Sequence, residues 1–356
     1  MIENSGENKH LLDDPGRKAV EETLATWRGP LTLLEEMEGG ASTRRFFRIQ
    51  RQKGTAVAMY IPAPSQEIAK SRQSAGGAPF VEVAELLEKA SIPVPKIFER
   101  CDKQNVLLVE DLGEDTLARY LEKNPHDRLE LYKMAVRDLA HAQRSLSPLP
   151  EDCIVKKRAF DEELLRWEVE HFKDWALEAR GITLTDEDKK IFDKCASYLA
   201  RTISEWQRGF VHRDYQSRNL MVRSRSTENG STLSLTWIDF QDAMMGPRTY
   251  DLVALLTDSY QQFTTEFIND RLDEYCEILG IEEQRQLVGF EFDFLTVQRK
   301  LKDAGRFIFI DRVNKNPNFL PYVDSTIEKA RAALQRVDSQ GPLAEMNELL
   351  KKLLDK

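Results

Sequence analysis

The stretch "FVHRDYQSRNLMV" (210–222) sets a polar loop between two short apolar runs. The loop holds His212, Arg213 and Asp214, and Asn219 follows five residues after Asp214. Further on, "WIDFQDAMMGP" (237–247) carries Asp239 inside an apolar, strand-like run. Phosphoryl transfer from ATP needs a base near the acceptor hydroxyl and oxygen ligands that hold Mg²⁺ against the phosphates. An Asp and an Asn on a loop, with a second Asp at a strand end, meet this demand.

The spacing of these residues is that of a kinase catalytic loop and the metal-binding Asp that follows it. The alternative is a chance match between a polar loop and an unrelated acidic strand end. An Asp-Phe pair at the end of the apolar run "LTWIDF" argues against chance. A protein kinase is excluded, because Phe240 is followed by Gln241 and Asp242 in place of Gly. No Ala-Pro-Glu segment follows either.

Instead, "GPRTYDLVALL" comes directly after this segment. The combined pattern "HRDYQSRNLMV…WIDFQDAMMGPRTYDLVALLTDSY" resembles the aminoglycoside phosphotransferase-like superfamily of small-molecule kinases. Within it, the chain is similar to bacterial cell-wall amino-sugar kinases, which phosphorylate the anomeric hydroxyl of N-acetylmuramate and N-acetylglucosamine. The likeness covers roughly residues 31–335. Three further segments carry it: "GGASTRRFFRI", "FVEVAELLEKASIPVPKIF" and "QRKLKDAGRFIFIDRVNKNPNFLPYV" (298–323).

The resemblance implies an α+β, two-lobed, protein-kinase-like fold. We expect a small β-rich nucleotide-binding lobe at residues 1–112, with an N-terminal helical extension and a hinge near 108–113. A larger helical lobe at 113–356 would hold the catalytic loop (212–219), the metal-binding segment (238–242) and the acceptor site. The pattern along the chain agrees, since strand-like alternation is concentrated in the first third and helical periodicity in the remainder.

Local patterns predict the elements more closely. Helices are expected at 17–27, at 78–92 up to the Pro93 and Pro95 stops, at 116–146, 161–180 and 186–208, and from Tyr250 onward. Strands are expected within 31–64, at 105–113, and as short pieces at 209–212, 220–222 and 233–240. The segment "RSRSTENGS" (223–231) is expected to be a polar loop.

Roles carried over from the family fall on matching positions of this chain. Asp214 matches the catalytic Asp, which orients or deprotonates the acceptor hydroxyl. Asn219 and Asp239 match the magnesium ligands. Asp251 matches a buried Asp that supports the catalytic loop, and His212 matches a residue that braces it.

The nucleotide site implied by the resemblance lies in the first lobe. Backbone N–H groups of "GGASTRRFF" would cover the phosphates of ATP, and the strand "LLVEDLG" would read the adenine edge. Tyr60 stands where kinases of this fold place a phosphate-binding Lys, so another cation must act there; the candidates are Arg44, Arg45, Arg48 and Lys70. The residues expected to bind ATP are Gly40, Ser42, Thr43, Arg44, Glu110 and Leu112.

The acceptor site is less defined by sequence. Residues 298–315 hold six Lys or Arg against two Asp, a net charge of 6 − 2 = +4. Such a basic helix end fits an anionic or neutral sugar better than a polycationic drug, and a solvated helix face is the alternative. Arg218 and Asp242 could contact substrate, or could be a solvent-facing Arg and an ordinary turn acid. The expected substrate-binding residues are Arg218, Asp242, Arg299 and Lys300.

Composition limits the remaining possibilities. The 356 residues carry a net charge of −9, which disfavours a general nucleic-acid binder. The N-terminal stretch lacks the layout of a signal peptide, and no apolar run reaches the length of a membrane span. Four scattered cysteines fit reduced thiols in a cytoplasmic protein. We therefore expect a small-molecule acceptor, with no nucleic-acid or membrane partner; the oligomeric state is left open.

The sequence thus predicts an ATP- and Mg²⁺-dependent kinase that forms a sugar 1-phosphate in cell-wall recycling. Another small alcohol or amino alcohol, of the choline or aminoglycoside type, is an alternative acceptor. A catalytically weak nucleotide-binding scaffold is an alternative of another class, and Tyr60 favours it. The presence of Asp214, Asn219 and Asp239 opposes it, because a scaffold does not need all three oxygen ligands.

Overall fold

The computed structural model describes residues 14–27, 30–37, 44–62, 78–227, 230–337 and 341–355. By compactness the chain divides into two units. The first consists of Met1–Glu114 with Thr236–Asp242, and the second of Asp115–Leu235 with Ala243–Lys356. The segment Thr236–Asp242, which we expected in the second lobe, therefore packs with the first unit.

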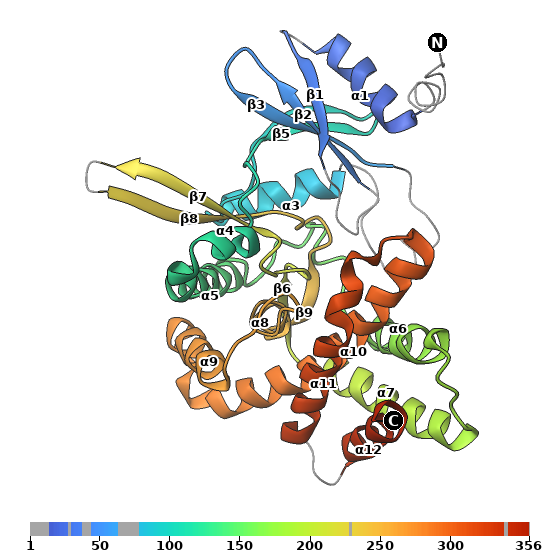
Figure 1. Ribbon diagram of the computed structural model, residues 1–356. Coiled ribbons are helices and arrows are strands. Elements are labelled where there is room, and N and C mark those ends of the chain that lie inside the picture. The colour runs from blue at the N-terminus through green and yellow to red at the C-terminus, as the bar shows by residue number, and fades with distance from the viewer. Residues whose placement is uncertain are drawn as a thin grey trace, which may run out of the picture. The chain divides into compact units, whose positions relative to one another are not determined.

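The first unit is built on a five-stranded antiparallel sheet with the order β1-β2-β3-β5-β4. Its strands are β1 (Thr32–Met37), β2 (Arg45–Gln50), β3 (Thr55–Tyr60), β4 (Ile97–Cys101) and β5 (Val106–Glu110) (Figure 1). Helix α1 (Pro15–Thr26) begins where the Asp14 carboxylate accepts the N–H groups of Gly16 and Arg17, which a helix start leaves unpaired.

One apolar cluster joins α1 to this sheet. Alternate residues of β2 and β3 point to the same face, as strand geometry requires, and they meet the apolar side of α1 there. Helix α3 (Ala78–Lys89), in the same unit, ends before Pro93 and Pro95, as the sequence predicts. The buried members of the cluster are Val20, Leu24, Phe47, Ile49, Ala56, Ala58, Val106 and Leu108.

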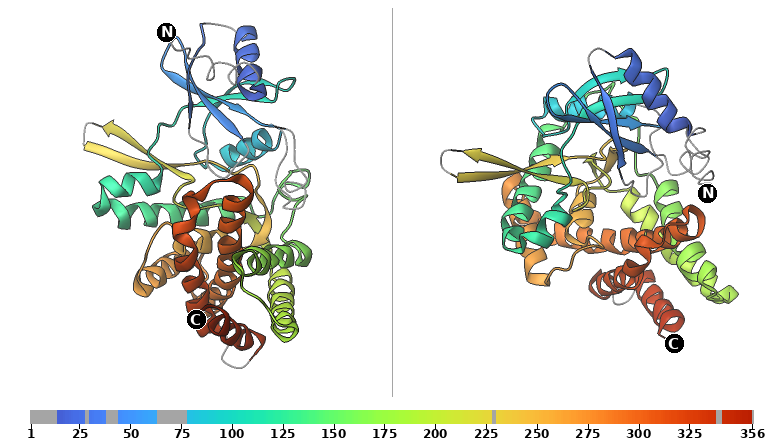
Figure 2. Two further views of the ribbon diagram at one scale, coloured as in Figure 1. Left: turned by 45° about the vertical axis from the view of Figure 1, so that its right-hand side comes forward. Right: turned by 45° about the horizontal axis from the view of Figure 1, so that its top comes forward.

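The second unit is mostly helical. Its helices are α4 (Leu117–Lys123), α5 (Arg128–Ser145), α6 (Glu162–His171), α7 (Asp186–Ser204), α8 (Tyr250–Leu256), α9 (Thr265–Leu279), α10 (Arg285–Asn314), α11 (Val323–Val337) and α12 (Pro342–Leu354). Figures 1 and 2 show the long helix α10 running among the others, and it packs against α6, α8, α9 and α11. This central position gives α10 many buried residues for its length.

Two small sheets complete the second unit. Strands β6 (Arg208–Val211) and β9 (Met244–Pro247) pair antiparallel, and the loop 212–219 leaves the end of β6. Strands β7 (Leu220–Thr227) and β8 (Gly230–Trp237) form a two-stranded ribbon. Strand β7 packs beside α4, and in Figure 1 the ribbon extends to the left of this helix.

The structure confirms the predicted helices and most of the predicted strands, and it corrects three points. The segment 223–231 was expected as a polar loop, but its described residues 223–227 and 230–231 belong to the strands β7 and β8. Strands β4 and β9 were not predicted. Both are short and carry no clear alternation, so only their partners β5 and β6 identify them.

Candidate active site

The loop between β6 and β7 carries Asp214 and Asn219, and Asp251 holds its first residues. Asp251 lies in the first turn of α8 and is fully buried. One of its carboxylate oxygens accepts the His212 N–H at 2.7 Å, and the other accepts the Arg213 N–H at 3.0 Å. Burial raises the pKa of Asp251 to about 7, although these two hydrogen bonds oppose the rise. The supporting contacts predicted for Asp251 are therefore present.

Arg213 adopts a backbone conformation that is rare for a side-chain-bearing residue, with φ at +84°. Such a residue costs free energy and persists only where its surroundings hold it. The Arg213 guanidinium lies 3.5 Å from the Glu168 carboxylate, and both side chains are buried. The Arg213 carbonyl accepts a hydrogen bond of 2.8 Å from Arg299. Contacts on the amide, the carbonyl and the side chain thus fix this turn of the loop.

Asp214 is the partly exposed carboxylate of the loop, with 30% of its side chain accessible. Burial opposes its ionisation, but the positive charges of Lys302, Arg299 and Arg213 outweigh burial and lower its pKa. Its N–H donates to Nδ1 of His212, which is itself fully buried. His212 therefore acts as an acceptor within the loop, which agrees with the bracing role expected for it. Asp214 carries a negative charge at neutral pH.

Asn219 closes the loop. Its Nδ2 donates to the Asp214 carbonyl at 2.8 Å, and its backbone N–H donates to the Gln216 carbonyl at 2.8 Å. The side-chain nitrogen is thus committed to the loop, and the side-chain oxygen is the atom with the chemistry of a magnesium ligand.

A second anchor was not foreseen from the sequence. Asp258, after α8, accepts hydrogen bonds from both the backbone N–H and the hydroxyl of Ser217, at 2.9 and 2.5 Å. The Lys329 ammonium donates to the carbonyls of Asp258 and Gln261 at 2.5 and 2.7 Å, and burial lowers the pKa of Lys329 to about 8. The only sequence signal was the "TDSY" end of the family pattern, which does not name a partner for Asp258.

At two positions the basic segment of α10 differs from a solvated helix face. Arg299 and Lys300 have side chains that are only 2% exposed. Lys300 lies 2.8 Å from the Asp303 carboxylate, and Arg299 contacts Asp214 at 3.2 Å. A solvated helix face is therefore wrong for these two residues, because both are buried and paired inside the second unit.

Arg218 is stacked among aromatic rings. Its guanidinium lies 3.5 Å from the ring centroid of Tyr260, and it donates to the Tyr322 hydroxyl at 3.4 Å. Cation–π stacking of this kind holds the side chain in place, so a freely solvated Arg218 is wrong.

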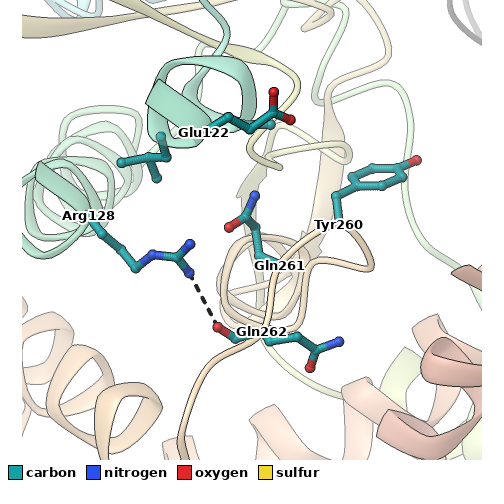
Figure 3. A pocket seen from close by; sticks show the side chains of 7 residues that line it. Glu122, Arg128, Tyr260, Gln261 and Gln262 are labelled. Carbon is teal, nitrogen blue, oxygen red and sulfur yellow. Dashed lines mark hydrogen bonds between the residues drawn. The ribbon is translucent and has the colours of Figure 1, made fainter. Parts of the chain in front are cut away.

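Tyr260 also borders a pocket of about 340 Å³ within the second unit. In Figure 3, Glu122 from α4, Arg128 from α5 and Gln261 surround the opening, and Arg128 donates to the Gln262 carbonyl at 3.3 Å. The pocket lies next to the loop 212–219, because the N–H of Ala118, which lines it, donates to the Ser217 carbonyl at 3.1 Å.

Asp239 belongs to the first unit and has a positive φ of 63°. Its carboxylate forms an ion pair with Arg44 and accepts a hydrogen bond of 3.1 Å from Gln241, whose amide also bonds to Asp242. The Trp237 N–H donates to the Pro93 carbonyl at 2.8 Å, which attaches this segment to the turn after α3. Asp242 is buried by these contacts.

Of the other residues expected at the nucleotide site, some lie within the described residues and some lie outside them. Gly40, Ser42, Thr43 and Lys70 lie outside the described residues. Glu110 ends β5, and its N–H donates to the Lys96 carbonyl at 2.8 Å; Leu112 follows and is half-buried.

The two other arginine candidates are engaged within the sheet of the first unit. Arg45 pairs with Asp14 and Glu36. Arg48 pairs with Asp111 at 2.9 Å and with Glu35 at 2.6 Å. Of the described candidates, Arg44 is the one that contacts a proposed metal ligand.

Comparison with known proteins identifies the family of this chain. The family described as "Phosphotransferase enzyme family" matches residues 34–290. The chain belongs to this family. Similar curated proteins are the N-acetylmuramate/N-acetylglucosamine kinases of Pseudomonas aeruginosa and Neisseria meningitidis. The first is 33% identical over 91% of this chain and 89% of that protein. The second is 26% identical over 85% of this chain and 86% of that protein.

Solved structures of this phosphotransferase's fold include a microcompartment-associated aminopropanol kinase and the aminoglycoside phosphotransferase APH(2'')-Ib with ADP bound. The aminopropanol kinase has a TM-score of 0.58 and 12% identity, and covers 89% of this chain and 96% of that one. The aminoglycoside enzyme has a TM-score of 0.53 and 15% identity, and the match covers 90% of this chain and 99% of that one. The expected kinase-like fold is confirmed, and the protein is a phosphotransferase with a hydroxyl acceptor. No helix in the described parts is long and apolar enough to span a membrane.

Proposed function

We propose that this phosphotransferase is an ATP- and Mg²⁺-dependent sugar kinase. Its acceptor is the anomeric hydroxyl of N-acetylmuramate or N-acetylglucosamine, a step in cell-wall recycling. Residues 1–112 would form the nucleotide-binding lobe and 113–356 the lobe that binds the acceptor. The observation that carries the proposal is Asp214, an ionised and partly exposed carboxylate on a loop fixed from several sides. The named relatives support the choice of acceptor.

Asp214 would meet the acceptor hydroxyl and take its proton as transfer proceeds. The hydroxyl O–H bond breaks, the oxygen forms a bond to the γ-phosphorus, and the bond from that phosphorus to the bridging oxygen breaks to release ADP. The lowered pKa of Asp214 makes it a weak base. Its main contribution is therefore to orient the hydroxyl, and the proton moves to it late, once the oxygen is bonded to phosphorus.

The magnesium ligands we propose are Asn219 and Asp239. Among the described residues, no group of three or more His, Cys, Asp or Glu side chains could hold a metal ion. One carboxylate and one amide still fit Mg²⁺, which takes its other ligands from water and phosphate. The Asp239 carboxylate already attracts the Arg44 cation, so a positive charge suits this position. When bound, the ion would neutralise charge on the phosphates.

Arg44 is the residue we propose in place of the missing third-strand Lys. Arg45 and Arg48 are held by carboxylates elsewhere in the sheet. A guanidinium presents several N–H donors in a planar fork, which suits phosphate oxygens. Glu110 and Leu112 would read the adenine edge, and Gly40, Ser42 and Thr43 would cover the phosphates.

The charge around Asp214 bears on the acceptor class. Arg213, Arg299 and Lys302 all lower the pKa of Asp214, and these three cations outnumber the two carboxylates, Glu168 and Asp303, that pair with them. A cationic acceptor, such as an amino alcohol or an aminoglycoside, would be repelled there, whereas a neutral or anionic sugar would not. This favours the sugar acceptor over the choline-like alternative.

A substrate panel tests the proposal. The protein is incubated with ATP and Mg²⁺ and with N-acetylmuramate, N-acetylglucosamine, choline or an aminoglycoside, and ADP is measured. We expect ADP with the two amino sugars, and ³¹P NMR should show a sugar 1-phosphate. The sugar alcohols made by reducing each sugar should give no product, because they lack an anomeric hydroxyl. Turnover of choline or aminoglycosides alone, or equal turnover of the reduced sugars, would overturn the assignment.

A further inference from the structure

Arg299 is a buried arginine near the middle of α10 whose guanidinium reaches the catalytic loop. Its Nη1 donates to the Arg213 carbonyl at 2.8 Å, and its Nη2 lies 3.2 Å from Oδ1 of Asp214. The guanidinium carbon lies 4.9 Å from the ring centroid of Tyr250 in α8. The side chain is only 2% exposed. Two of its nitrogens thus bond to the loop, and a side chain so enclosed offers little surface to an acceptor.

The two hydrogen bonds reach two different parts of the loop. One reaches the carbonyl of Arg213, the residue with the positive φ, and the other reaches the carboxylate of Asp214. A planar guanidinium fixes the angle between its N–H groups, so both parts are held in one geometry relative to α10. A lysine ammonium in the same place is a point charge and lacks this fork.

The neighbours of Arg299 keep it in this orientation. Asp303, one helical turn further along α10, lies 3.8 Å from Nε of Arg299 and 2.8 Å from Nζ of Lys300. Tyr250 covers the face of the guanidinium. Burying so many charges is costly unless they are paired, and such an arrangement is weak evidence for stability alone. The geometry therefore calls for a role besides stability.

We propose that Arg299 is a positioning residue for phosphoryl transfer. It holds Oδ1 of Asp214 toward the protein and so directs Oδ2 to the acceptor hydroxyl, while it also fixes the strained turn at Arg213. This inference rests on the proposed function, in which Asp214 orients that hydroxyl. Arg299 itself touches neither the acceptor nor ATP. It acts by removing rotational freedom from the side chain that does, and such preorganisation is a large part of what an active site contributes.

The test compares Arg299→Met, Arg299→Lys and a matched control, Arg271→Met. Arg271 in α9 is also buried at 3% exposure, lies 4.8 Å from the ring centroid of Phe267 and pairs with Glu274 at 2.7 Å, and both of these partners belong to α9 itself. We expect Arg299→Met to lower kcat about 10²-fold while KM for ATP stays within about twofold. Arg299→Lys should recover part of that loss, because it restores the charge without the fork. Arg271→Met should keep the wild-type kcat even if its Tm falls as much as that of Arg299→Met.

A second measurement does not depend on the acceptor. Crystal structures of the wild type and of the Arg299 variants, without acceptor, should show Asp214 in one rotamer in the wild type and in several in the variants. If Arg299→Met does not fold, Arg299→Lys serves for both measurements. Wild-type kcat and an unmoved Asp214 in the Arg299 variants would overturn the inference, as would an equal loss of kcat in Arg271→Met. A wild type that phosphorylates no amino sugar would refute the proposed function instead, and the crystal structures would still test Arg299.

Discussion

Asp214 shows how the surroundings of one residue set its chemistry. An aspartate with most of its surface covered would ordinarily resist ionisation, but Lys302, Arg299 and Arg213 keep this one charged. Its backbone is tied to its own loop, through the Asp214 N–H to His212 and the Asp214 carbonyl to Asn219. The result is a fixed anion suited to orienting a hydroxyl.

The first prediction concerns this carboxylate. Asp214→Asn keeps the size and the hydrogen bonds of the loop but removes the base, so kcat should fall about 10²-fold or more. Binding of ATP, measured by calorimetry, should change little. Turnover within a few-fold of the wild type would show that Asp214 has been given the wrong role.

The second prediction concerns the metal ligands. Asp239→Ala removes a charged ligand, and activity should not return when magnesium is raised. Asn219→Ala removes a neutral ligand and should be milder, with partial recovery at high magnesium. The measurement is a magnesium titration of kcat for each variant. Unchanged activity in both variants, or a preference for zinc in the wild type, would contradict the two-ligand proposal.

At the scale of elements, one close helix crossing stands out. Gly305 in α10 packs directly on the chain where α6 ends and the π-helical segment Phe172–Leu177 begins. A Cβ at Gly305 would lie 2.3 Å from the His171 carbonyl oxygen and 2.7 Å from the Phe172 nitrogen. Both contacts are with backbone, which cannot move aside cheaply. The glycine therefore lets α10 approach this junction closely.

Gly305→Ala should accordingly destabilise the protein by roughly 1–3 kcal/mol, since it forces packed backbone apart. The matched control is Gly289→Ala in the same helix, where the Cβ would meet only the end of the flexible Arg285 side chain at 3.0 Å. That control should be neutral or stabilising by up to about 1 kcal/mol through helix propensity. Chemical denaturation of both variants decides the matter. Equal stability of the two would show that the crossing adapts without cost.

At the scale of the whole molecule, the free energy of unfolding depends on pH through titratable side chains that are buried in the folded protein. His171 is buried between Trp167 and Phe309, with ring centroids at 4.5 and 5.9 Å. Burial, together with the nearby charges of Arg306 and Lys302, lowers its pKa to about 4. The folded protein thus keeps His171 neutral at a pH where the unfolded chain takes up a proton.

The difference in pKa between the folded and the unfolded protein sets the direction in which stability changes with pH. As pH falls from about 6.5 to about 4, protons bind the unfolded chain first, so the free energy of unfolding decreases. His171→Gln cannot titrate. The stability of the wild type relative to this variant should therefore drop by about 3 kcal/mol between pH 7 and pH 4. Denaturation curves of both proteins at several pH values test this, and a constant difference would mean that His171 does not titrate as described.

The sequence alone determined those features that depend on residues close together in the chain. The spacing of Asp214 and Asn219 needs only one loop, and the helix and strand periods need only local geometry. The sequence also shows that Tyr60 stands where kinases of this fold place a phosphate-binding Lys, because this difference concerns a single position. For the same reason the family, and with it the kinase-like fold and the class of enzyme, follows from the sequence alone.

Only the tertiary structure decided which distant residues support that loop. Arg299 lies 85 positions from Asp214, and Asp258 lies 41 from Ser217, so no local period connects them. The basic stretch of α10 looked like a surface because charge is usually exposed, and it is buried because Asp303 and the loop pair with it. Short strands such as β9 likewise exist only through their partners. Pairing across long separations is an outcome of packing, and the linear pattern of a chain does not record it.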